Sequence, residues 1–291
     1  MDAGNCRRRR WGDRKDGYLV RDIDGIHKIM PHIMPNRTEA ETYAEFELDI
    51  TETMEFLKKR KSGEPPDSRT KFFHCFLMSA AKTLRHRPLM NRFVCGRRTY
   101  EHRDIKLGFT SKKKFTDESK DFLTVITVED DWTLSKITDV VTDSVSGSRK
   151  NGSSGSGAVD RCARLPRCIL MAMAKFLRFL NFYGWIPSSI SDGDVSFTSA
   201  LLSNLGSING PPAYHHLNNY GTNSVVVTIG TISEKTDADG HTRQYVKIGV
   251  TIDERIADGL YFVRSMKYLQ YLLDNPELLD RPLAETVDID G

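Results

Sequence analysis

The sequence has too few cysteines, in the wrong arrangement, for a disulfide framework or a zinc site. There are five, Cys6, Cys75, Cys95, Cys162 and Cys168, and no two of them form a C-x-x-C pair. An odd set of scattered cysteines is typical of reduced thiols in a cytosol-like compartment. We therefore expect a cytoplasmic protein with no metal cofactor.

Four motifs of well-known enzyme classes are also absent. The chain has no G-x-x-x-x-G-K-[ST], no G-x-S-x-G, no H-E-x-x-H and no G-x-G-x-x-G. These absences argue against a P-loop, an α/β-hydrolase serine, a zinc protease site and a dinucleotide-binding loop. The formal net charge is only +3, so the chain as a whole is not expected to bind nucleic acid by its charge.

The N-terminus is basic, but it is not followed by the long apolar run of a secretory signal. Residues 1–16 contain four consecutive arginines, Arg7 to Arg10, and then Arg14 and Lys15. We predict that this segment is a flexible, solvated tail. The alternative is a contact with a phosphate-bearing ligand or an anionic surface.

The rest of the chain has the composition of an ordinary globular domain. Of 291 residues, 39% are hydrophobic and 28% are charged. A chain of this size can bury a core without disulfides. We predict one domain over residues 17–285.

The spacing of apolar residues predicts that strands and helices alternate along this domain. Strands are predicted over 43–50, 103–111, 122–128, 224–232 and 245–252, the last two as a hairpin. Helices are predicted over 72–85, 132–145 and 259–273. Residues 146–157 are rich in Gly and Ser and carry no apolar side chain, so we predict a flexible loop there.

Residues 165–185 are predicted to form an unusually apolar helix. Arg167, Lys175 and Arg178 fall on one stripe, and nearly all other positions are apolar. The two central cations argue against a membrane span. Three alternatives remain: burial against the core or a partner subunit, contact of residues 168–185 with a membrane surface, or a wall for a long apolar substrate.

Two motifs resemble the acyltransferase core of 2-oxo acid dehydrogenase complexes. Residues 253–259 read Asp-Glu-Arg-Ile-Ala-Asp-Gly, where that family has Asp-His-Arg-x-x-Asp-Gly, and a helix with an Asn-Pro-Glu ending follows. Residues 203–206 read Ser-Asn-Leu-Gly, which is similar to a second motif of the family. The resemblance covers roughly residues 17–282. With glutamate in place of histidine, the first motif resembles that of a short, free-standing branch of the family.

This resemblance implies an α/β (α+β) fold of the chloramphenicol acetyltransferase type, a two-layer sandwich in which helices cover a mixed β-sheet. It also implies a homotrimer with an acyl-transfer channel at the subunit interface. The implied activity moves an acyl group between a coenzyme A or lipoyl thioester and a second acceptor, which the sequence does not name. No lipoyl domain and no peripheral subunit-binding domain are recognised, so we do not expect the working core of a classical complex.

The resemblance also assigns roles to single residues. Ser203 stands at the position of the hydroxyl that donates to the oxyanion, and Asp258 at the position of the aspartate that holds the loop. Glu254 stands where the family has its catalytic histidine. Beside Ser203, Asn204 and Gly206 are the loop positions expected to contact coenzyme A.

Lys112 and Lys113 are a further candidate contact for coenzyme A. They follow a predicted strand, where the family has a segment with glycine and proline, and their charge suits the phosphates of the coenzyme. The alternative is a solvated, charged end of the strand.

Glutamate is a weaker base than histidine for a thiol. With ordinary pKa values of about 8.5, 6.5 and 4.3 for thiol, histidine and glutamate, the difference between the two bases is about 3 kcal/mol, roughly 100-fold in rate. A second candidate base is one of His215 and His216, which follow the Ser203 loop. The functional alternative is a catalytically impaired homologue that acts as a binding or scaffold protein.

Overall fold

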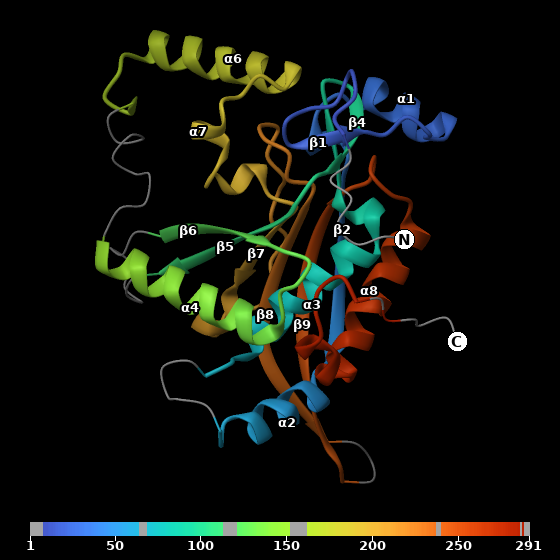
Figure 1. Cartoon of the computed structure of the whole chain (residues 1–291), viewed down its shortest axis with the longest axis vertical. Helices are drawn as coiled ribbons and strands as arrows, with labels where there is room; N and C mark the ends of the chain where they lie inside the picture. Colours follow the sequence, from blue (N-terminus) through green and yellow to red (C-terminus); the bar gives the residue numbers. More distant parts are fainter. Residues whose placement is uncertain are drawn as a thin grey trace.

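The structure is a computed structural model that describes residues 8–63, 69–112, 121–151, 162–236, 240–285 and 287. Its helices and strands follow one another as drawn in Figure 1. In chain order they are β1 (Gly17–Leu19), α1 (Gly25–Ile33), β2 (Glu41–Asp49), α2 (Thr51–Arg60), α3 (Phe72–His86), β3 (Arg92–Cys95), β4 (Arg98–His102), β5 (Ile105–Lys112), β6 (Asp121–Val128), α4 (Leu134–Asn151), α6 (Arg167–Tyr183), α7 (Ser188–Ser191), β7 (Ala200–Asn204), β8 (Val225–Thr236), β9 (Thr242–Asp253) and α8 (Gly259–Asp274).

A six-stranded mixed sheet forms the centre of the molecule, with the strand order β2-β9-β8-β7-β5-β6. Strand β7 runs parallel to both neighbours, and the other pairs are antiparallel. The predicted hairpin is confirmed as β8 and β9, which are rich in β-branched residues that favour strands. A smaller sheet of order β1-β4-β3 lies beside it.

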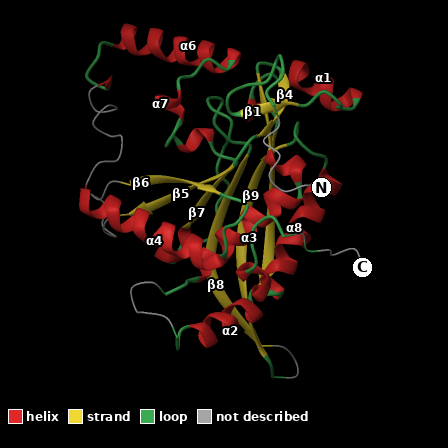
Figure 2. Cartoon of the chain, viewed as in Figure 1, coloured by secondary structure: helices red, strands yellow, loops and turns green. Residues whose placement is uncertain are grey.

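Helices cover one face of the large sheet (Figure 2). Alternation along β2 sets this side. Ala44, Phe46 and Leu48 pack toward the core, while Tyr43, Glu45 and Glu47 are exposed. The covering helices are α2, α3, α4 and α8, and α3 is buried from His74 to Leu84. The opposite face of the sheet, called the open face below, is not covered by these four helices.

Two expectations about mobile segments are wrong where the structure describes them. Helix α4 continues to Asn151, so residues 146–151 of the predicted loop are helical, and residues 152–157 lie outside the described residues. The predicted tail over 1–16 is ordered at its end, because Arg14 is 6% exposed and donates to Asp16 and to the carbonyl of Asn181. Residues 1–7 lie outside the described residues.

The apolar segment 165–185 does form a helix, α6, but it is not buried in the core of the chain. Nearly every residue of α6 is exposed or half-buried, and Asn181 is its one buried residue. Figure 1 shows α6 at one end of the molecule, away from the helices that cover the sheet.

His102, at the end of β4, predicts a pH dependence of stability. Its ring is buried and packs 4.5 Å from that of Phe93, and burial lowers its pKa to about 4. The unfolded chain binds this proton near pH 6.5 and the folded chain only near pH 4. The free energy of unfolding should therefore fall by roughly 3 kcal/mol as the pH drops through that window. Urea unfolding of the wild type and of His102→Phe at pH 7 and pH 4.5 measures this, and equal losses in both proteins would contradict it.

Candidate functional site

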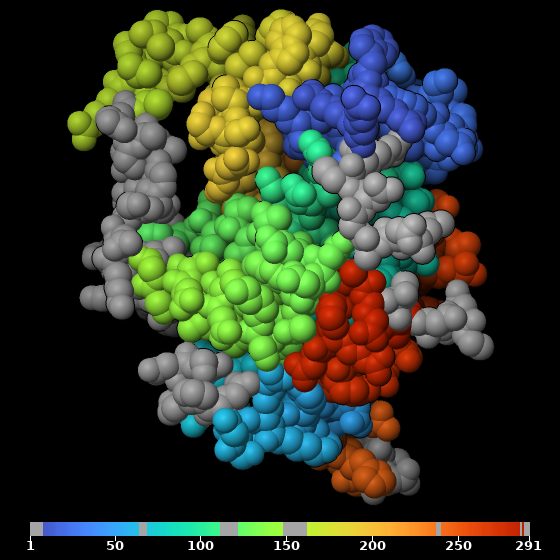
Figure 3. All heavy atoms as spheres, in the orientation of Figure 1, coloured from blue at the N-terminus to red at the C-terminus, as the bar shows by residue number. Residues whose placement is uncertain are grey.

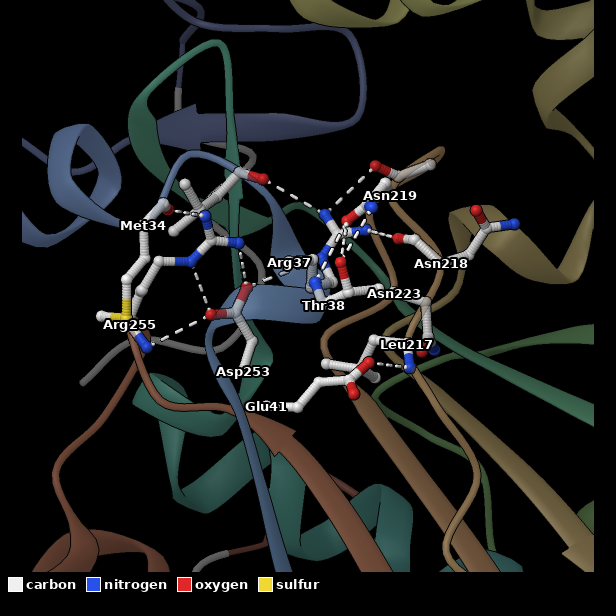
Figure 4. A network of polar contacts seen from close by, with 12 residues as sticks. Met34, Arg37, Thr38, Glu41, Leu217, Asn218, Asn219, Asn223, Asp253 and Arg255 are labelled. Atoms are coloured by element: carbon white, nitrogen blue, oxygen red, sulfur yellow. Dashed lines mark hydrogen bonds and ion pairs between the residues drawn. The ribbon is translucent and has the colours of Figure 1, made fainter.

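The loop after β9 is held by a buried ion pair between neighbours in sequence (Figure 4). Asp253 accepts two hydrogen bonds from the guanidinium of Arg255, from Nε at 2.7 Å and from Nη2 at 2.7 Å. Arg255 also donates to the carbonyl of Met34 at 2.7 Å, at the C-terminal end of α1. The aspartate and the arginine are 0% and 1% exposed. This pair fixes the turn that contains Glu254.

Arg37 joins the same network from the other side (Figure 4). Its guanidinium lies 3.5 Å from Asp253 and donates to the carbonyls of Asn218 at 2.5 Å, Val94 at 3.1 Å and Gly221 at 3.3 Å. One buried side chain thus ties the segment before β2 to β3 and to the loop before β8.

Two arginines share one carboxylate in this network. Arg37, Arg255 and Asp253 are all buried, so the network holds one positive charge in excess. Burial is the main cause that lowers the pKa of Arg37. The positive charge of Arg255 lowers this pKa further, and the negative charge of Asp253 raises it. The carboxylate is therefore the group on which the arrangement depends.

Glu254 lies one residue past the C-terminal end of β9, an interior strand of the sheet. Its backbone N–H donates to the carbonyl of Ala40 at 2.9 Å, and its carboxylate accepts from the hydroxyl of Thr42 at 3.2 Å. Along β2, Thr42 alternates with Glu41 and Tyr43, so it points to the helix side of the strand. The carboxylate of Glu254 is half-buried on that side.

Asp258 begins helix α8. Its carboxylate accepts from the backbone N–H of Tyr261 at 2.7 Å, which is an N-cap, and the side chain is exposed. The loop itself is held by Asp253 and Arg255, so the structural task that the resemblance gives to Asp258 is shared with residues that the sequence did not single out.

Ser203 lies on β7 with its hydroxyl on the open face of the sheet. Its neighbour Leu202 packs into the core on the helix side, which turns Ser203 the other way. The hydroxyl of Thr110 on β5 contacts Ser203 Oγ at 3.3 Å. Ser203 is half-buried, so the hydroxyl is within reach of a ligand on this face.

The two residues expected beside Ser203 have packing or capping roles. The Asn204 side chain accepts from the N–H of Ser207 at 3.2 Å and caps a short 3-10 turn, Leu205–Ile208. Gly206 lies against β8, where a Cβ would come within 2.3 Å of the carbonyl oxygen of Gly230. Glycine is required there because the two backbones touch.

The predicted histidine pair lies on a segment that crosses the open face from Gly210 to Leu217. Thr231 of β8 donates to the carbonyl of Gly210 at 3.0 Å, Tyr214 packs on Tyr43 of β2, and the N–H of Leu217 donates to Glu41 at 2.5 Å.

The two histidine rings are oriented by backbone carbonyls at the end of this segment. Nδ1 of His215 lies 2.7 Å from the carbonyl of His216, and Nδ1 of His216 lies 3.1 Å from that of Leu217. A carbonyl only accepts, so each Nδ1 carries the proton and each Nε2 is left as the basic nitrogen.

One copy of the chain does not bring Glu254 together with Ser203 or with the histidines. The strand register places Ser203 beside Thr228, and Thr228 beside Gly249 on β9. Gly249 lies five residues before Glu254, so Ser203 and Glu254 are separated by about 16 Å along the strand direction. The histidines lie on the open side of β2, and the carboxylate of Glu254 lies on the helix side. Lys112 ends β5, its side chain is not described, and Lys113 lies outside the described residues.

Comparison with known proteins identifies the fold. No protein-family model matches the chain, and no curated protein matches it in sequence. Among solved structures, dihydrolipoamide acetyltransferase of Azotobacter vinelandii is similar with a TM-score of 0.56 and 16% identity over 89% of this chain and 93% of that one. A truncated catalytic core of the 2-oxoacid dehydrogenase complex of Thermoplasma acidophilum gives 0.56 and 17% over 89% and 99%.

A chloramphenicol acetyltransferase is also similar, with a TM-score of 0.51 and 14% identity over 88% of this chain and 99% of that one. The chain therefore has the fold of these acyltransferases. The predicted sandwich of a mixed sheet covered by helices is confirmed. At these identities the likeness establishes the fold and leaves the activity to be argued from the residues.

Arg37 and Asp253 are the site residues that sequence reasoning missed. In the sequence, Asp253 is only the first letter of a motif, and Arg37 lies 216 positions before it. A lone arginine between Asn36 and Thr38 carries no local signal, because its partner is brought to it only by the pairing of β2 with β9.

Proposed function

We propose that the chain is a thioester-dependent acyltransferase. The observation that carries this proposal is the placement of Ser203 and Glu254 at the ends of two strands in an acyltransferase fold, with the spacing of a known catalytic set. The Azotobacter vinelandii enzyme is described with a serine, a histidine and an asparagine in its catalytic mechanism, the first two 52 and the last two four positions apart. Here Ser203, Glu254 and Asp258 are 51 and four apart.

The chemistry follows from the character of these side chains. A coenzyme A or lipoyl thioester is the acyl donor, and its carbonyl oxygen gains charge when the acceptor attacks the carbonyl carbon. The hydroxyl of Ser203 donates to that oxygen, and Thr110 beside it supports the hydroxyl. Glu254 takes the proton of the attacking hydroxyl or thiol and returns it to the departing thiolate.

We further propose that the active chain is a homotrimer in which these residues meet across subunits. The supporting observation is the separation of about 16 Å along the sheet between Ser203 and Glu254 within one copy. The Thermoplasma acidophilum relative is the core of a multienzyme complex. Analytical ultracentrifugation should give three times the 33.1 kDa chain mass, and an active monomer would exclude the shared site.

Replacing Ser203 by alanine should lower the rate of acyl transfer about a hundred-fold, because one donor to the oxyanion is lost. The measurement is thiol release from a panel of acyl-coenzyme A esters with alcohol and thiol acceptors, at saturating donor. Ser207→Ala, four positions further on in the 3-10 turn after β7 and exposed, is the matched control and should retain the wild-type rate.

The same panel separates catalysis from the alternative of a binding or scaffold protein, which the glutamate in place of histidine favours. Turnover that depends on Ser203 supports the acyltransferase. Saturable binding of acyl-coenzyme A without turnover by the wild type would overturn it in favour of the binding protein.

A further inference from the structure

Helix α6 exposes an apolar surface that no other part of the described chain covers. Several large side chains of α6 and the residues just after it remain between 44% and 61% exposed. They are Ile169, Met171, Phe176, Phe179, Phe182, Tyr183 and Trp185. Contiguous exposed surface of this kind marks an interaction site in a stable protein.

In the part of the chain that the structure describes, the contacts that hold α6 to the body lie near its C-terminal end. Asn181 accepts at its carbonyl from Arg14 Nη1 at 2.8 Å and from the thiol of Cys95 at 3.2 Å. Gly96 packs on the carbonyl of Phe182, where a Cβ would lie only 2.5 Å from the oxygen. These contacts hold α6 in a defined position and leave most of its length exposed.

Charge on this helix has one sign. From residue 164 to residue 191 there are four basic residues, Arg164, Arg167, Lys175 and Arg178, and no aspartate or glutamate. On a helix with 3.6 residues per turn the last three lie on one side, and Ile169, Phe176 and Tyr183 lie on the other. The result is an amphipathic helix with an apolar side and an opposite side that carries three cations.

A cavity of about 260 Å³ at the base of α6 adds to this positive charge. Its lining includes Arg37, Arg97, Arg178 and Arg255 and contains no acidic side chain. Arg97 and Arg178 are exposed and have no ion-pair partner among the residues that the structure describes. Arg37 and Arg255 share Asp253, so the excess positive charge at the base of α6 comes mainly from Arg97 and Arg178.

The N-terminal segment and helix α1 lie at the same end of the molecule as α6 (Figure 3). Arg14 ties the N-terminal segment to α6, and Trp11 on that segment is 89% exposed next to Arg10. Helix α1, which lies at the same end in Figure 1, exposes Ile26, Ile29 and Ile33 by 72%, 56% and 72%. Apolar and basic groups thus recur across this end.

We propose that α6 docks this protein on an anionic membrane surface, with the helix lying in the plane of the interface. The apolar face enters the boundary between headgroups and acyl chains, and the basic side chains meet lipid phosphates. Tyr183 and Trp185, whose rings stack 5.0 Å apart, suit the interfacial layer. A second copy of the chain is a poorer occupant, because it would bring like charges together.

The geometry of α6 fits lying on the membrane and does not fit crossing it. Its 17 residues span about 25 Å, shorter than the hydrocarbon core of a bilayer. Among the described residues, no helix is long and apolar enough to span a membrane.

Sedimentation with vesicles tests the proposal on the whole 291-residue chain. We expect binding to vesicles of phosphatidylcholine with phosphatidylglycerol, and binding at least ten-fold weaker to phosphatidylcholine alone. Phe176→Glu should weaken binding about ten-fold or more. Leu123→Glu, which changes a side chain 49% exposed on β6, is the matched control and should bind as the wild type does.

Charge is tested with two triple variants that each remove three cations. Arg167→Gln with Lys175→Gln and Arg178→Gln should weaken binding to anionic vesicles about a hundred-fold. Lys58→Gln with Lys59→Gln and Lys61→Gln, on and just after α2, should have little effect. Equal effects of the two triples, or no vesicle binding by the folded wild type, would overturn the proposal. The proposal would also be overturned if the wild type did not bind vesicles and Phe176→Glu lost self-association in ultracentrifugation. In that case α6 would be a contact between copies of the chain.

Discussion

Asp253→Asn is expected to destabilise the protein by about 3–5 kcal/mol, a large part of the stability of a typical domain. The substitution keeps the size of the side chain and removes its charge. Arg37 and Arg255 would then lie buried beside each other with no carboxylate, and the 2.7 Å charge-assisted hydrogen bonds to Arg255 would be lost or weakened. Urea unfolding followed by circular dichroism measures the change.

Asp130→Asn is the matched control for this experiment. Asp130 also accepts two hydrogen bonds from an arginine, Arg85, at 2.8 and 3.2 Å, but both side chains are largely exposed. Exposed pairs of this kind contribute about 1 kcal/mol or less. If Asp253→Asn were as mild as Asp130→Asn, Asp253 would not be the group that holds the loop.

Glu254→Gln is expected to lower the rate of acyl transfer by about 10²- to 10⁴-fold, because an amide cannot accept the proton of the attacking group. The amide oxygen can still accept from the hydroxyl of Thr42, so the fold should be unchanged. Thiol release at saturating donor gives the rate. Glu55→Gln, an exposed position on α2, is the control and should keep full activity.

Glu254→His and the histidine pair complete the test of the base. Imidazole at position 254 is expected to raise the rate, by up to roughly 100-fold from the difference in ordinary pKa values. A strong loss in His215→Ala with His216→Ala, together with no loss in Glu254→Gln, would move the base to the histidine pair. If neither variant changes the rate, both assignments are wrong.

Much of the fold was readable because its segments have strong periodicity. The alternation of Phe46 and Leu48 with glutamates predicts β2, and the apolar spacing from Phe72 to Leu84 predicts α3, since each pattern needs one buried face. Short strands such as β1 and β3 have three or four residues, too few for a pattern to be recognised. The composition of the Gly- and Ser-rich stretch predicts a loop, but its residues through Asn151 are helical. They extend an existing helix, which costs less free energy than starting one.

By itself, the sequence determined the order of the main strands and helices, the two motifs that carry Ser203 and Glu254, and the basic, apolar character of residues 165–185. Only the tertiary structure decided that Arg37 meets Asp253, that Ser203 and Glu254 stand apart in one copy, and that α6 is left uncovered. The physical reason is that local patterns report which face of a segment avoids water. The partner of that face is chosen by strand register and packing between residues distant in the chain, and that choice is not written in any local pattern.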